Sequence, residues 1–132
     1  MKLHLLSCGI WTVLAVYTDE ERCDVLDLAK GLRRDDPREY ARLMRAFARL
    51  STSGPPRNVR FSRPLGHGIF ELKTRGGVRV LYFFDEGRVV VCCEALPKPK
   101  QRGLAVAIDR AARMRWRYLN DKRHGALRIM ED

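Results

Sequence analysis

The chain has 132 residues, of which 45% are hydrophobic, and this length and composition predict one domain with a substantial core. No apolar run approaches the length of a membrane span, which argues against a transmembrane protein. The formal net charge of +10 favours a polyanionic partner, which could be nucleic acid, an acidic protein, or both.

The positive charge is concentrated after residue 40. Residues 1–40 carry six basic and eight acidic side chains, whereas residues 41–132 carry twenty basic and eight acidic ones. Arginine supplies twenty of the 26 positive charges, a bias that a GC-rich genome also produces. Charge alone therefore favours nucleic-acid contact without deciding it.

The first predicted element is a strand over residues 10–17. Residues 1–9 resemble a signal sequence superficially, but Asp19 and two glutamates follow too soon for an export signal. We expect 1–9 to be a disordered leader outside the domain.

Two helices are predicted next. Thr18 and Glu21 have the spacing of a capping box, which predicts a helix that ends at Gly31. Asp36 before Pro37 predicts the start of a second helix, whose apolar residues recur at helical spacing up to Leu50. We expect a helical hairpin with its apolar stripes on a sheet.

The centre of the chain predicts a three-stranded antiparallel meander over 68–74, 78–84 and 88–96, preceded by an extended segment at 58–63. Gly76-Gly77 and Glu86-Gly87 suit the tight turns between the strands. A three-residue first turn pairs Lys73 with Arg79, and a two-residue second turn pairs Arg79 with Glu94. This register gathers the charged side chains on one face of the sheet.

A C-terminal helix is predicted from about residue 103 to residue 120, and residues 121–132 are expected to be disordered. The elements give an α+β fold of order β-α-α-β-β-β-α, in a single domain over residues 10–120. The four cysteines have no zinc-ligand spacing, so we expect no metal, no cofactor, and free thiols in a reducing cytoplasm.

The segment GIFELKTRGGVRVLYFF, with the EALPKPKQRG that follows it, resembles the RelE/HigB toxin superfamily. The first segment matches the "LyELR…yRVLYF" pattern, and the second resembles the F-x-K-K segment of HigB-like members. The resemblance implies a RelE-like fold and the toxin of a type II toxin–antitoxin pair. Many such toxins are ribosome-dependent mRNA endonucleases, so it also implies a cognate antitoxin, of helix-turn-helix type, and mRNA and the ribosome as partners.

The resemblance also implies a site. Arg79 matches the arginine of "yRVLY", a phosphate-stabilising position in nucleolytic relatives, Lys73 stands where "ELR" has arginine, and Lys98 matches the first lysine of F-x-K-K. Glu94 is either a general base or a salt-bridge partner of Arg79. Further candidates for RNA contact are Arg75, Lys100, Arg102 and, by stacking on a base or else by packing in the core, Phe83.

Three functions compete at this point. The first is an mRNA endonuclease that cleaves by 2′-OH attack. The second is a non-enzymatic inhibitor of the ParE type, which acts on DNA gyrase. The third is a phage or prophage relative that keeps the fold without the activity. The basic cluster and the KPK segment favour the first.

Overall fold

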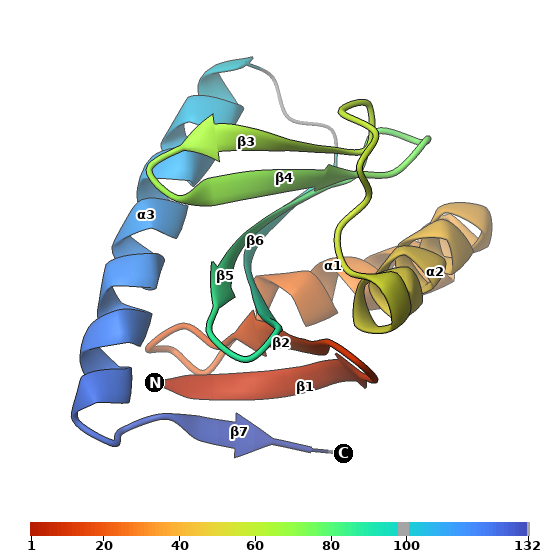
Figure 1. The fold of residues 1–132 in the computed structure, drawn as a ribbon. Helices are drawn as coiled ribbons and strands as arrows, with labels where there is room; N and C mark the ends of the chain where they lie inside the picture. The colour runs from red at the N-terminus through yellow and green to blue at the C-terminus, as the bar shows by residue number, and fades with distance from the viewer. Residues whose placement is uncertain (98–100, 132) are drawn as a thin grey trace.

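A computed structural model describes residues 1–97 and 101–131 of the chain (Figure 1). Its described part is a mixed seven-stranded sheet with a helical hairpin on one face and a long helix on the other. The α+β prediction is thus confirmed, and the fold is compatible with a RelE-like fold. The elements in chain order are β1 (Lys2–Cys8), β2 (Thr12–Val16), α1 (Asp24–Asp35), α2 (Pro37–Ser53), β3 (Ser62–Gly66), β4 (Ile69–Lys73), β5 (Arg79–Asp85), β6 (Val89–Leu96), α3 (Gln101–Arg123) and β7 (Arg128–Met130).

The strands lie in the order β3-β4-β5-β6-β2-β1-β7. Strands β3 to β6 form the antiparallel meander, β2 joins β6 in parallel, and β1 pairs antiparallel with β2. The helical hairpin covers one face and α3 crosses the other (Figure 1). No helix in the described part of the chain is both long and apolar enough to cross a membrane.

Both ends of the chain are strands, and the predicted disorder there is wrong. Leu3 on β1 has no exposed surface and packs in the core under α3. Strand β7 pairs in parallel with β1, and the Arg128 amide donates to the Met1 carbonyl at 2.9 Å. The short β7 has little apolar periodicity of its own, so its partner strand decides its structure.

The second helix begins as predicted, whereas the first does not. Asp36 caps α2 by accepting from the Glu39 amide at 3.2 Å, and Pro37 is the first helical residue. In the first helix, Thr18 accepts instead from the Arg22 amide within a turn, and α1 begins at Asp24. Gly31 lies inside α1, because the helix continues to place Leu32 against the core.

The sheet separates two apolar cores. The core under the hairpin includes Leu43, Phe47 and Tyr82, and the core under α3 includes Ile69 and Phe83. Three of the four cysteines are buried in these cores, with Cys92 and Cys93 on opposite faces of the sheet, whereas Cys8 is exposed.

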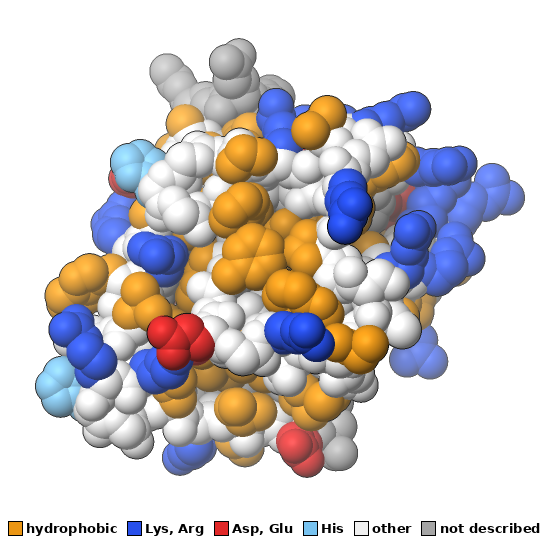
Figure 2. Space-filling view, in the orientation of Figure 1, with side chains coloured by type: hydrophobic (Ala, Val, Ile, Leu, Met, Phe, Trp, Pro, Cys, Tyr) orange, Lys and Arg blue, Asp and Glu red, His pale blue; other side chains and the backbone are white. Residues whose placement is uncertain are grey.

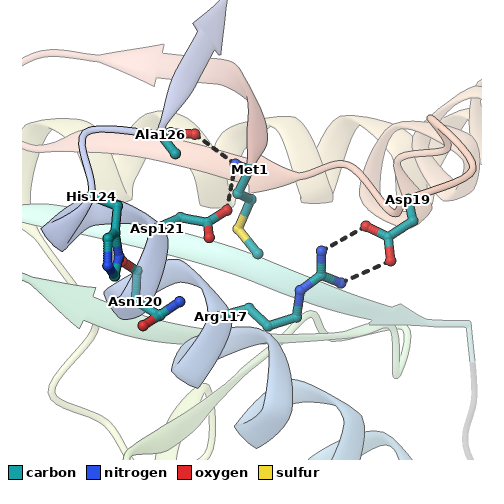
Figure 3. Close-up of polar contacts among 7 residues, drawn as sticks. All are labelled: Met1, Asp19, Arg117, Asn120, Asp121, His124 and Ala126. Carbon is teal, nitrogen blue, oxygen red and sulfur yellow. Dashed lines mark hydrogen bonds and ion pairs between the residues drawn. The ribbon is translucent and has the colours of Figure 1, made fainter.

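Helix α3 is attached to the sheet by polar contacts as well as apolar ones. The Tyr118 hydroxyl and the Lys122 ammonium donate to Asp85 at 2.6 and 2.8 Å. Burial raises the pKa of Asp85, but these hydrogen bonds and the Glu86 amide outweigh it, and the net shift is downward. Near its C-terminus, Asp121 accepts from the Met1 amine at 2.6 Å, and Arg117 forms a bidentate pair with Asp19 (Figure 3). The helix is therefore fixed at several points along its length.

The first prediction tests whether β1 is part of the folded domain. Leu3→Ala should lower the free energy of unfolding by about 2–5 kcal/mol, because it opens a cavity in the core under α3. Ile10→Ala, at a side chain that is 63% exposed, is the matched control and should change it by less than about 0.5 kcal/mol. Denaturant unfolding measures both, and equal small effects would contradict a folded β1.

Candidate functional site

The candidate site lies on the α3 face of the sheet, where β4 ends and β5 begins. Lys73 pairs with Arg79 across these strands, as the sequence predicted. Glu71 pairs with Leu81, whose side chain is in the core under α3, so side chains at alternate positions point to that face. Glu71, Lys73 and Arg79 therefore share one side of the sheet.

The pairing of β5 with β6 differs from the prediction. The turn has three residues, since Asp85 pairs with Val89, and Gly87 and Arg88 both have positive φ. A β-bulge at Cys93 then shifts the register again. Glu94 therefore lies opposite Leu81, and Arg79 lies opposite Leu96. Each one-residue shift moves a side chain to the other face of the sheet, and the two shifts together restore it. Glu94 therefore lies on the same face as Arg79, as predicted, but is not paired with it.

The partner of Arg79 is Glu71, which the sequence analysis did not single out. Arg79 Nη1 donates to Glu71 Oε2 at 2.8 Å, and Arg63 Nη2 lies 3.6 Å from the same oxygen. The Glu71 side chain is 3% exposed and that of Arg79 is 21% exposed. A buried carboxylate between two arginines fixes Arg79, whose side chain keeps part of its surface exposed. Alternation in the strand could have found Glu71, because it lies two residues before Lys73.

Glu94 has a different arginine. Arg110 on α3 donates through Nε to Glu94 Oε1 at 2.7 Å, and the Glu94 side chain is 2% exposed. Burial raises the pKa of Glu94, and the hydrogen bond and charge of Arg110 offset only part of that shift. The pair brings α3 to the edge of the site and gives Glu94 a positioning role that competes with the predicted role as a base.

The turn between β4 and β5 carries Arg75 and is fixed to the helical hairpin. The Thr74 hydroxyl donates to Glu39 on α2, a buried carboxylate that also accepts from Arg42 Nη1 at 3.0 Å. Gly76 lies directly against this carboxylate, and a Cβ there would overlap it. Arg75 itself is exposed within this fixed turn.

The aromatic candidates divide into buried and exposed. Phe83 has no exposed surface and packs edge-on against Tyr118 at a centroid distance of 5.2 Å. This geometry does not support the predicted stacking of Phe83 on a base, because the sheet and α3 cover the ring. Trp116, in contrast, is 64% exposed.

The remaining candidates follow β6. Lys98 and Lys100 lie outside the described residues, and Arg102 is described only by its backbone in the first turn of α3. The described strand ends at Leu96, which pairs with Arg79. Thus the structure brings Lys73, Arg79 and Glu94 to one face and adds Glu71, Arg63 and Arg110. Positive side chains also stand over α2 and along α3, on either side of an apolar strip (Figure 2).

The arrangement can bind a phosphate and stabilise charge on it. Arginine held by a carboxylate is preorganised, and guanidinium groups match phosphate oxygens in a bidentate manner. Lys73 is partly exposed on the same face and makes no ion pair with the residues that the structure describes. Fold and site thus define a RelE-compatible α+β protein with a cationic cluster on its sheet.

The chain belongs to the phage-derived Gp49-like family (DUF891), whose model matches residues 30–115, from within α1 to within α3. This family is associated with the toxins of toxin–antitoxin systems. No curated protein and no solved structure matches the chain significantly. The matched range contains the cluster around Arg79 and Glu71 and leaves out β1, β2 and β7.

The second prediction concerns Gly76. Gly76→Ala should lower the free energy of unfolding by about 1–3 kcal/mol, because its methyl group displaces the Glu39 carboxylate from Thr74. Gly31→Ala is the matched control: it lies inside α1 with open space around it and should raise stability by about 0.5–1 kcal/mol. Denaturant unfolding measures both variants.

A double-mutant cycle identifies the cause. Combined with Glu39→Ala, Gly76→Ala should cost much less than it does alone, because the atoms that it would meet are gone. Additive effects of the two substitutions would contradict the contact as the reason for glycine.

Proposed function

We propose that this chain is the toxin of a type II toxin–antitoxin pair and that it cleaves mRNA on the ribosome by attack of a ribose 2′-OH. The observation that carries the proposal is the Arg79 guanidinium, which the buried Glu71 holds in place, on a side chain that remains 21% exposed. Membership of a family associated with such toxins supports the biological role.

In this proposal, Arg79 stabilises the negative charge that develops on the phosphorane. A guanidinium has five N–H donors, and Glu71 engages Nη1, which leaves donors for phosphate oxygens. The carboxylate fixes the position of the group before the substrate arrives, so little reorganisation is needed in the transition state. Arg75, Lys100 and Arg102 add charge for the RNA backbone.

Proton transfer is assigned to the lysines and to one carboxylate. Lys73 and Lys98 are candidates for removing the 2′-OH proton and protonating the 5′-oxygen, since an amine can both accept and donate a proton. Glu94 is the carboxylate candidate, because its raised pKa suits proton transfer. Because its hydrogen bond to Arg110 would have to break before Glu94 could act, Glu94 is the second candidate after the lysines.

The partners follow from the charge. Residues 41–132 carry twenty basic and eight acidic side chains, which suits ribosomal RNA and also an acidic antitoxin. We propose a cognate antitoxin of the helix-turn-helix type that binds this surface and neutralises the toxin.

Expression in a bacterium tests the function directly. Brief induction should arrest growth, co-expression of the antitoxin should relieve the arrest, and primer extension on cellular mRNA should show new 5′ ends. Arrest with intact mRNA would favour a non-enzymatic inhibitor. Normal growth with soluble protein on a gel would favour an inactive relative.

The next prediction separates catalysis by Arg79 from its structural role. Arg79→Ala should lower the cleavage rate by on the order of a hundredfold or more, as expected when one stabilising donor is lost. It should also destabilise the fold, because Glu71 remains buried with only the more distant Arg63. Arg79→Lys should restore activity only in part, because one ammonium cannot replace the guanidinium fork.

The double variant Arg79→Ala/Glu71→Gln resolves the two effects. Removing both charges should recover much of the lost stability, because no unpaired buried carboxylate remains. Cleavage should stay low if Arg79 contacts the phosphate. Recovery of cleavage together with thermal stability would show that the pair is only structural.

A further inference from the structure

The outer face of α3 carries a row of arginines around one exposed tryptophan. Arg110, Arg113, Trp116 and Arg117, which we call the α3 stripe, recur at spacings of three and four residues and therefore lie on one side of the helix. All four are exposed, and the opposite side of the helix packs through Ala107, Ala111 and Tyr118. The stripe therefore does not belong to the core.

Trp116 has no other exposed large hydrophobic side chain near it on the described part of α3. Its indole is 64% exposed, and the neighbouring exposed side chains on the stripe are arginines. The other exposed large hydrophobic residue on this helix, Val106, is ten residues away, about 15 Å along the axis. In the space-filling view, hydrophobic side chains on the α3 side lie among positive ones (Figure 2). An exposed aromatic ring beside arginines offers two elements that nucleic-acid binding requires, which are a stacking surface for a base and positive charge for phosphate.

The arginines of the stripe differ in how readily they can leave their present partners to contact a phosphate. Arg117 forms the bidentate pair with Asp19, which holds its guanidinium in place (Figure 3). Arg113 pairs only with Asp109 among the described residues, at 3.3 Å, and both side chains are about three-quarters exposed. Such an exposed pair is weak, so a phosphate can replace Asp109 as the partner of Arg113.

We propose that the α3 stripe binds single-stranded RNA, with one base stacked on Trp116 and a neighbouring phosphate on Arg113. The stripe is continuous with the candidate site, because Arg110 bonds to Glu94 on the face that carries Arg79. Arg110 and Trp116 are separated by about 9 Å along the axis. The inference rests on the proposed function for the identity of the RNA, and it assigns the stripe a role in holding the strand beside the site.

An acidic protein is the other polyanion that could cover these arginines. Aromatic residues that anchor protein interfaces are surrounded by contacts that exclude water from around them. The exposed neighbours of Trp116 on the stripe are charged instead. Base stacking tolerates such surroundings, because it needs one accessible ring face and a nearby cation. The stripe therefore favours RNA.

Binding of an RNA that cannot be cleaved tests the inference apart from the enzymatic activity. The probe is a short, dye-labelled 2′-O-methyl oligouridine, whose blocked 2′-oxygen cannot attack, and the readout is fluorescence anisotropy. Trp116→Ala should weaken binding by on the order of tenfold, and Trp116→Phe should retain most of the affinity. Arg113→Gln should reduce the slope of log affinity against log salt by about 0.7, the value for one phosphate contact on a single strand.

Two controls identify the stripe as the cause. Arg45→Gln removes the same charge from an exposed position on α2, on the other side of the sheet, and should leave binding unchanged. The chain has two tryptophans, and the partly buried Trp11 contacts Phe84. Intrinsic fluorescence of the parent should therefore be quenched by RNA, and that quenching should disappear in Trp116→Ala.

The outcomes separate the two proposals. Failure of the parent to bind the probe, or equal affinity of the parent and Trp116→Ala, overturns the inference. Weaker binding of polyglutamate by Trp116→Ala with unchanged RNA binding overturns it in favour of an acidic protein. Absence of mRNA cleavage with the expected loss of RNA binding refutes the nuclease and leaves the stripe as an RNA-binding surface.

Discussion

The buried ion pair between Glu71 and Arg79 is the interaction on which the site depends. A carboxylate that is 3% exposed is stable only with hydrogen-bonded cations around it, so Glu71 holds Arg79 at 2.8 Å and draws Arg63 to 3.6 Å. The pair joins β4 to β5 diagonally and fixes one guanidinium at the surface of the sheet. An arginine that is fixed for the fold is also preorganised for a phosphate, which is the role that we propose for Arg79.

Helix α3 extends this site along the molecule. Arg110 connects the helix to Glu94, and the Tyr118, Lys122 and Asp85 contacts fix its later turns against the end of β5. With its inner side buried and its ends attached, the helix presents the outer stripe as a rigid row of charge. The opposite face of the sheet serves stability: the hairpin covers the larger core, and Glu39 on α2 fixes the turn that carries Arg75.

Local patterns predicted most of the regular structure but not the exact pairing. The start of α2 followed from Asp36 and Pro37, and the Lys73–Arg79 pair followed from the turn at Gly76-Gly77. The Thr18–Glu21 pattern failed because those residues form a turn before α1. The Arg79–Glu94 pair failed because the second turn has one more residue than predicted and Cys93 forms a bulge. Neither shift changes the pattern of residues along the strand in a way that distinguishes it, from the sequence alone, from a regular strand.

The sequence by itself determined the class of fold, the meander, the helical hairpin and the face on which the charges gather, because these depend on periodicity and on turn residues within a few positions. Only the tertiary structure decided which carboxylate meets which arginine, since such pairs join residues on different elements: Glu71 with Arg79, and Glu94 with Arg110. It also decided that both terminal segments form strands, because β1 and β7 are stabilised by pairing and burial against distant segments. Long-range pairing has no local signature, and for that reason the pairing of Lys73 with Arg79 across a short turn was predictable whereas the carboxylate partner of Arg79 was not.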